Sequence, residues 1–125
     1  MPSPVMTKGP VTLLAPQALA ASASVSTVLL DASARFEAQV QVTGTFGTVA
    51  GTNGLQVQVF PAIGSTPAYD TIPAATMVIP GTASTTQTQT LKLPTGLYQL
   101  RLTNLDGTNP LSNVGVTWAS IDSVQ

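Results

Sequence analysis

The side chains that could carry out acid–base chemistry in this chain are few. Its 125 residues contain five Asp or Glu, four Lys or Arg, and no His. Asp31 and Glu37 flank a short turn and could serve as a general acid and base, the pairing used in glycoside hydrolysis. Nothing in the pattern fixes their separation, and so few acids leave little choice of partner. The sequence therefore predicts no catalytic residue.

A second candidate for chemistry is the segment Asp106–Asn109, whose oxygen atoms are of the kind that Ca²⁺ prefers. It holds a single carboxylate, and an Asp-Gly step is ordinary turn chemistry. We therefore expect a turn here. The chain has no Cys and no His, so zinc, copper, haem and iron–sulfur sites lack their usual ligands. Neither a metal nor a cofactor is expected.

The missing residue types also exclude whole classes of function. Without an imidazole base, Ser-His-Asp and Cys-His nucleophilic systems cannot be built within the chain, which favours a protein that is not an enzyme. Basic residues occur at only four scattered positions, too few to neutralise a row of phosphates: Lys8, Arg35, Lys92 and Arg101. No apolar run approaches the ~18 residues of a transmembrane helix. We expect neither a nucleic-acid nor a membrane partner.

Aromatic residues are the last candidates for ligand binding. Trp118, Tyr98 and Tyr69 could form a stacking platform for a sugar. Trp118 and Tyr98, however, lie in the apolar register of their segments, where large aromatic side chains usually fill a core. The sequence favours the core for these two residues.

The elements that must position these residues are short strands. Ten Gly and ten Pro are scattered along a chain that is 43% hydrophobic and long enough for one domain. Apolar and polar residues alternate with the period of a strand, most clearly over Arg35–Thr43. The expected strands are Ser24–Asp31, Arg35–Thr43, Leu55–Phe60, Thr76–Ile79, Thr85–Leu93, Leu97–Asn104 and Val114–Ile121. This spacing predicts an all-β, two-sheet antiparallel β-sandwich, with an immunoglobulin-like or a jelly-roll topology.

The first part of the chain has a different composition. Residues 1–22 hold four prolines and predict an extended N-terminal arm with a short strand at Val11–Leu14, ahead of a sandwich domain over residues 23–125. Pro16 and Gln17 interrupt the apolar stretch, so we expect no secretory signal. The arm either lies against a partner or folds back on its own domain. In the first case its apolar side chains form the interface, at Val5, Val11, Leu13 and Leu14.

The surface composition favours an assembly. Only 7% of the residues are charged, and the polar faces of the expected strands carry Gln, Thr and Ser. Charged edges and faces are how β-proteins avoid sticking to one another, and neutral side chains cost less to desolvate than charges. Thr85–Leu93 is the extreme case, since neither of its faces is apolar before Leu91. We expect it to be an edge strand or to be covered by a neighbouring molecule, and the whole chain to be a structural subunit.

Three segments together resemble a known class of protein. Val28–Val42 reads VLLDASARFEAQVQV, Gly54–Phe60 reads GLQVQVF, and Leu93–Asn104 reads LPTGLYQLRLTN. Over residues 20–121 the chain resembles small β-sandwich structural proteins of tailed bacteriophages. Such proteins often carry a charged Asp-Gly and a Trp after the Val-x-Val strand, whereas Ala62–Tyr69 has neither.

The resemblance implies a place in the virion. It implies a capsid decoration (cement) protein that binds the outer capsid surface and stabilises the head. Its partners would be the major capsid protein or other virion proteins, and the chain would be a homo-oligomer. A tail, neck or baseplate sandwich protein is the first alternative. A module that binds host glycans is the second, from a different functional class.

Overall fold

The computed structural model describes residues 4–5, 8–33, 37–47, 54–63, 68–121 and 123–124. All regular elements in these ranges are β-strands, as the alternating sequence predicted. The strands are β1 (Pro4–Val5), β2 (Lys8–Leu19), β3 (Ser24–Ser26), β4 (Leu30–Asp31), β5 (Glu37–Thr45), β6 (Leu55–Ile63), β7 (Ala68–Tyr69), β8 (Ala75–Ile79), β9 (Thr86–Pro94), β10 (Leu97–Asn104), β11 (Leu111–Ile121) and β12 (Ser123–Val124).

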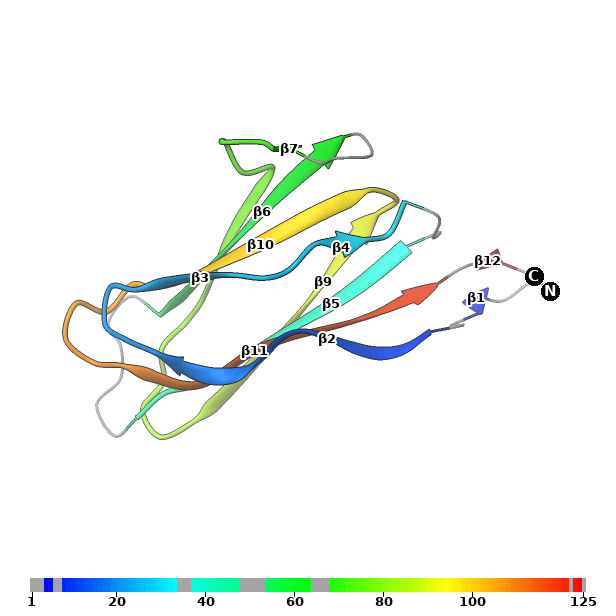
Figure 1. The fold of residues 1–125 in the computed structure, drawn as a ribbon. Helices are drawn as coiled ribbons and strands as arrows, with labels where there is room; N and C mark the ends of the chain where they lie inside the picture. The colour runs from blue at the N-terminus through cyan, green and yellow to red at the C-terminus, as the bar shows by residue number, and fades with distance from the viewer. Residues whose placement is uncertain are drawn as a thin grey trace.

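The strands form two packed antiparallel sheets, so the predicted β-sandwich is confirmed (Figure 1). One sheet has the order β2-β11-β5-β9. The other has the order β3-β10-β6-β7, with β4 also paired to β10 and β8 to β6. The two-stranded pair β1-β12 extends from one end of the molecule, next to both termini.

The strand pairings are nested, which identifies the topology. Pro4 lies opposite Val124 in the outermost pair, and Ile63 lies opposite Ala68 in the innermost pair. Between them, β2 pairs with β11, β3 and β4 with β10, and β5 with β9. The chain is thus one long hairpin rolled into two sheets. Of the two topologies that the sequence left open, this is the jelly roll.

The N-terminal segment is part of this sandwich over Lys8–Leu19. These residues form the edge strand β2, which pairs with β11 along its length, and the side chains of Leu13 and Leu19 lie in the core. The expected extended conformation is therefore present, but β2 is not a detached arm. Prolines are tolerated here because an edge strand has one side without ladder hydrogen bonds. Of the two alternatives for the arm, a contact with a partner or with its own domain, Lys8–Leu19 takes the second.

The core lies between the inward faces of both sheets. In β5, Ala38, Val40 and Val42 are fully buried, while the intervening Gln39 and Gln41 face outward. Leu100 and Leu102 of β10 face them from the opposite sheet and are equally buried. This alternation follows from the period of two, because successive side chains in a strand point to opposite faces.

Two expected strands differ from their predicted form. Ser24–Asp31 is interrupted after Ser26, because the amide of Leu100 donates to the Thr27 hydroxyl (3.1 Å). Only one backbone hydrogen bond of this residue pair is formed, from the Thr27 amide to the Leu100 carbonyl (2.9 Å). In β6, the strand was expected to end at Pro61 but continues to Ile63. The Pro61 carbonyl accepts a hydrogen bond from the Asp70 amide, so the missing N–H of Pro61 is on the β7 side and costs no bond to β10.

The segment Thr85–Leu93 was expected to be an edge strand. This prediction is confirmed, because β9 lies at the edge of its sheet.

Candidate functional site

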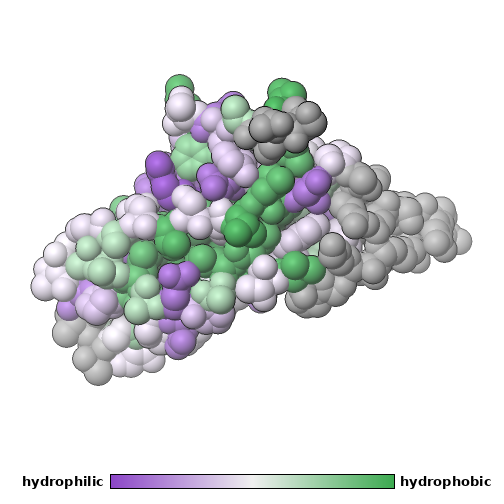
Figure 2. Space-filling view, viewed as in Figure 1, coloured by the Kyte–Doolittle hydropathy of each residue, from purple (hydrophilic) through white to green (hydrophobic). Residues whose placement is uncertain are grey.

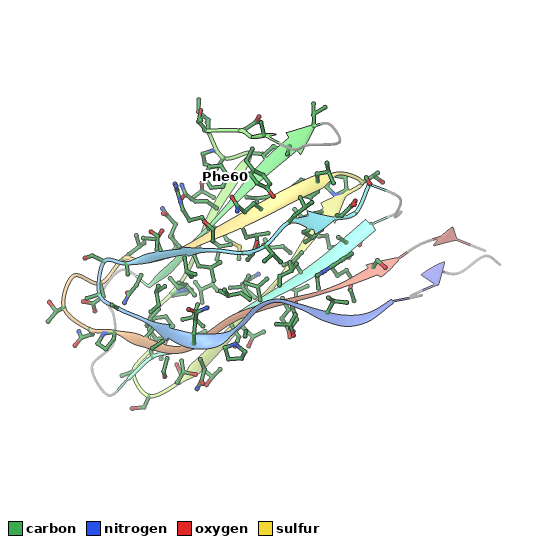
Figure 3. The ribbon with its side chains drawn as sticks, in the orientation of Figure 1. Phe60 is labelled. Atoms are coloured by element: carbon green, nitrogen blue, oxygen red, sulfur yellow. The ribbon has the colours of Figure 1, made fainter. Side chains whose placement is uncertain are left out.

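A hollow of about 280 Å³ opens on the outer face of the β3-β10-β6-β7 sheet. We call it the Phe60 hollow. Its lining comes from β3, β6, β7, β10 and the turn after β7: Ser26, Phe60, Tyr69, Asp70, Thr71, Gln99 and Arg101. Gln99 and Arg101 face outward because they alternate with the buried Leu100 and Leu102. Figure 3 labels Phe60 on the side of this sheet that faces away from β5 and β11.

Phe60 forms the base of the hollow and is covered by Arg101. Leu55, Val57 and Val59 of β6 face the core, so Phe60 falls on the outer face, yet only 6% of its surface is exposed. The guanidinium carbon of Arg101 lies 4.8 Å from the centroid of its ring, within the range of a cation–π contact. Nε and Nη2 of Arg101 also donate to Oε1 of Gln58, at 3.2 and 2.9 Å. The guanidinium group is thus held by two neighbours on β6.

The opposite wall is built by β7 and the turn that follows it. Ala62 pairs with Tyr69, and the Asp70 amide donates to the Pro61 carbonyl at 2.9 Å. These contacts fix the backbone of the wall. Among the described residues, the exposed Asp70 carboxylate accepts no hydrogen bond and forms no ion pair. A carboxylate and a guanidinium group therefore line the same hollow without pairing to each other.

The outer face of the other sheet is mostly uncharged: among its outward positions on β5 and β9, only Glu37 and Lys92 carry a charge, and both lie at one end of the face. Its β5 positions pair with the outward positions of β9, and hydroxyl pairs join Thr43 to Thr88 (3.1 Å) and Thr45 to Thr86 (2.9 Å). We call this surface the Thr/Gln face and define it by Gln39, Gln41, Thr43, Thr45, Thr86, Thr88, Thr90, Lys92 and Thr117. Figure 2, in the orientation of Figure 1, shows purple hydrophilic groups scattered among white and green ones on the visible side of the molecule.

A smaller hollow of about 180 Å³ interrupts this face beside Gly115. The β2–β11 register shifts on both sides of Val114, and Leu14 and Pro16 of β2 line the hollow together with Gln41. A Cβ on Gly115 would lie 3.2 Å from the Leu14 carbonyl oxygen, so glycine permits this close approach of β2. The hollow is largely apolar and holds no charged side chain.

The residues proposed for acid–base chemistry are not arranged as a catalytic pair. Asp31 lies on β4 and Glu37 on β5, in different sheets. Oδ1 of Asp31 accepts hydrogen bonds from the amide (3.0 Å) and the hydroxyl (2.6 Å) of Ser33. The Asp31 carboxylate therefore stabilises the turn after β4.

Asp106 adopts the turn that the sequence favoured. Its Oδ1 accepts from the amides of Thr108 (2.7 Å) and Asn109 (3.0 Å), and its Oδ2 accepts from Nδ2 of Asn109 (3.0 Å). Asn104 also stabilises the loop, because its Nδ2 donates to the carbonyls of Leu19, Ala20 and Asn109. This network ties the β10–β11 loop to the end of β2. Among the described residues, no group of three or more His, Cys, Asp or Glu is placed to hold a metal ion.

Two of the three aromatic residues considered for a sugar platform are not available at the surface. Trp118 and Tyr98 are 6% and 8% exposed and belong to the core, as the apolar register predicted. Tyr69 alone remains half-buried at a surface, where it lines the Phe60 hollow. Phe60 and Arg101 were not identified from the sequence, although one signal was present: Phe60 is a large apolar residue in the polar register of its strand.

The four residues expected at an interface are distributed differently. Leu13 is only 6% exposed and packs within the core, so it is not available to a partner. Val11 and Leu14 are half-buried and pack against the core edge, and Leu14 also lines the smaller hollow. Val5 pairs with Ser123 through the backbone, and its side chain is outside the described residues. A role for Val5, Val11 and Leu14 in an interface stays a prediction.

Comparison with known proteins extends only to the fold. No protein-family model and no curated protein sequence matches the chain. The VP2 subviral particle of infectious bursal disease virus is similar in structure, with a TM-score of 0.54 and 12% identity over 91% of this chain and 32% of that chain. The SPBc2 prophage-derived protein YomS has a TM-score of 0.53 and 10% identity over 97% of this chain and 96% of that one. The β-sandwich is therefore shared with viral proteins. Within the described residues, no helix is long and apolar enough to cross a membrane.

Proposed function

We propose that this chain is a structural protein of a tailed-phage virion, without enzymatic activity. In this proposal it is a capsid decoration (cement) protein that binds the major capsid protein on the outer surface and stabilises the head. The observation that carries the proposal is the Thr/Gln face of the β2-β11-β5-β9 sheet.

The Thr/Gln face has the chemistry of a surface that becomes covered. Burying a charge costs far more than burying a hydroxyl or amide that finds a hydrogen-bond partner. On β9, Thr86–Thr90 carries no charge, and Lys92 is the first cation along the strand. The strand is also an open sheet edge, and over Thr86–Leu91 it carries neither the charges nor the proline that usually prevent strand addition; Lys92 and Pro94 lie only at its end. Docking against another subunit explains both features.

The likeness to YomS and VP2 supports this proposal at the level of the fold. YomS is described as prophage-derived and matches this chain over nearly its whole length. The part of VP2 that matches belongs to a subviral particle. A jelly roll also occurs in proteins other than those of viruses, so the fold alone does not indicate a virion role. The proposal therefore rests on the Thr/Gln face.

In this proposal, the chain contacts a neighbouring subunit through the Thr/Gln face and the exposed side of β2. Leu13 and the rest of Lys8–Leu19 belong to the sandwich and cannot reach across to another subunit as a free arm. Head decoration and a tail, neck or baseplate position both use such a face. The copy number per particle distinguishes them.

The test is binding of the purified protein to capsids that lack it. Gln41→Lys places a charge at the centre of the Thr/Gln face, on a side chain that is already exposed. Val78→Lys is the matched control, because Val78 is exposed on β8 of the opposite sheet. We expect Gln41→Lys to weaken capsid binding about tenfold or more and Val78→Lys to bind like the parent protein. Equal binding of both variants, with unfolding transitions like that of the parent, would contradict the proposal.

A further inference from the structure

The Phe60 hollow is a second surface feature, on the sheet opposite the Thr/Gln face. Its volume of about 280 Å³ is close to the lower end of small-molecule sites, which are typically ~300–1,000 Å³. It combines an aromatic side chain, Tyr69, with polar side chains from β3, β10 and the turn after β7. The size suits a single ring and excludes a long chain lying within it.

The charges of the hollow indicate the kind of ligand. Asp70 and Arg101 are its two charged side chains, of opposite sign, and they do not form an ion pair with each other. The carboxylate accepts hydrogen bonds only, and the guanidinium group donates only. A ligand that satisfies both must donate at one point and accept at another, and it should be neutral because the two charges balance. Hydroxyl groups do both.

The polar groups are held in place before any ligand arrives. Phe60 and Gln58 hold the guanidinium group of Arg101. Gln99 donates its Nε2 to the Thr27 carbonyl (3.1 Å), which aims its amide and leaves Oε1 as an acceptor. A site that is already organised loses less entropy when it binds.

We propose that the Phe60 hollow binds a neutral sugar ring. Asp70 accepts hydrogen bonds from ring hydroxyls, Arg101 and Gln99 bind neighbouring oxygens, and the apolar side of the ring packs on Tyr69. A decoration protein docked through its Thr/Gln face presents this hollow on the opposite sheet. The inference nevertheless stands on the hollow alone and holds wherever the chain is located.

The experiment is a two-dimensional ¹H–¹⁵N NMR titration of the purified chain with the methyl glycosides of glucose, galactose, mannose and N-acetylglucosamine. We expect saturable shifts of the amides of Asp70, Gln99 and Arg101 with at least one of them. The Kd should be on the order of millimolar, because a ligand of about a dozen heavy atoms rarely binds more tightly. The emission of Trp118 should not change, since that residue is buried in the other sheet.

Three variants distinguish specific binding from weak surface contact. Asp70→Asn keeps the shape and removes the charge, and Tyr69→Ala removes the stacking surface. Each should weaken binding about tenfold or more, while Gln41→Ala on the opposite sheet should leave it unchanged.

The proposal is overturned if none of the four glycosides gives saturable shifts, or if the shifts map outside the hollow. It is equally overturned if Asp70→Asn and Tyr69→Ala both bind like the parent. Methyl glucuronide tests the charge argument, because tighter binding than methyl glucoside would show that the ligand is an anion held by Arg101. These outcomes are independent of capsid binding, which is measured with Gln41→Lys.

Discussion

Arg101 lies over the ring of Phe60 through a diagonal contact between neighbouring strands. In the β10–β6 register, Arg101 is opposite Gln58 and Gln99 is opposite Phe60. Diagonal neighbours in a sheet are within reach of long and aromatic side chains. The contact covers Phe60 on the outer face of this sheet, and Phe60 does not belong to the core cluster on the other side.

Phe60→Leu tests this contact directly. The leucine keeps an apolar side chain but removes the π face, so Arg101 loses one of its two supports. We expect the free energy of unfolding to fall by about 1–2 kcal/mol in urea denaturation, from the lost cation–π contact and the poorer packing. The side-chain Nε–H resonance of Arg101 should also shift. An unchanged resonance together with unchanged stability would show that the contact is absent in solution.

Gly54→Ala tests the turn into β6. Gly54 has a φ of +79°, in the left-handed region, and an added Cβ would collide with the carbonyl oxygen of Ile79. We expect a loss of about 2–4 kcal/mol in the free energy of unfolding, from the backbone strain and the collision with another strand. Gly47→Ala is the control, because no atom of the described residues lies within 4 Å of its added Cβ. If both variants unfold at the same urea concentration, the turn does not require glycine at position 54.

Asp106→Ala tests the loop network between β10 and β11. Asp106 is 4% exposed, and the substitution leaves the amides of Thr108 and Asn109 without their acceptor. We expect unfolding to become easier by about 1–3 kcal/mol. The matched control is Asp70→Ala, since that carboxylate is exposed and bonds to no described residue, and it should change stability by less than about 0.5 kcal/mol. Equal losses would place Asp106 among ordinary surface acids.

The alkaline stability of the protein should depend on Tyr98. Burial raises the pKa of this phenol, whose hydroxyl donates to the Pro94 carbonyl at 3.0 Å. In the unfolded chain the phenol loses its proton near pH ~10, before the folded state does. The contribution of the Tyr98 phenol to the free energy of unfolding is therefore fully present below about pH 10. This contribution is lost as the pH rises toward the raised pKa of the folded state.

Urea unfolding of the parent and Tyr98→Phe between about pH 8 and about pH 11 measures this effect. The variant should be less stable near neutral pH, by about 1 kcal/mol for the lost hydrogen bond, and should decline less steeply above pH ~10. Parallel curves for the two proteins would contradict a buried, hydrogen-bonded phenol.

Strands with one buried face were predictable from the sequence. Over Glu37–Thr43 the core residues alternate with outward Gln and Thr, and the buried face follows from that alternation alone. The topology was not predictable, because a jelly roll and an immunoglobulin-like sandwich share this period. Their difference lies in which distant strands pair, such as β2 with β11 and β3 with β10.

The N-terminal strand and the Phe60 hollow could not be predicted for local reasons. The β2–β11 register shifts at several points, so the alternation that would have revealed β2 as a sandwich strand is broken. In the hollow, Phe60, Tyr69 and Arg101 come from three strands, and only the pairing of β6 with both β7 and β10 brings them together. Trp118 and Tyr98 were placed correctly because each follows the apolar register of its own strand.

The central claim, a structural role in the virion, is tested most directly by the copy number of the chain in purified phage particles. Quantitative mass spectrometry of whole particles and of tail-less heads measures both abundance and location. We predict many copies per particle, at a constant ratio to the major capsid protein in both samples. A few copies that sediment with tails would contradict capsid decoration, and absence from particles would contradict a virion role altogether.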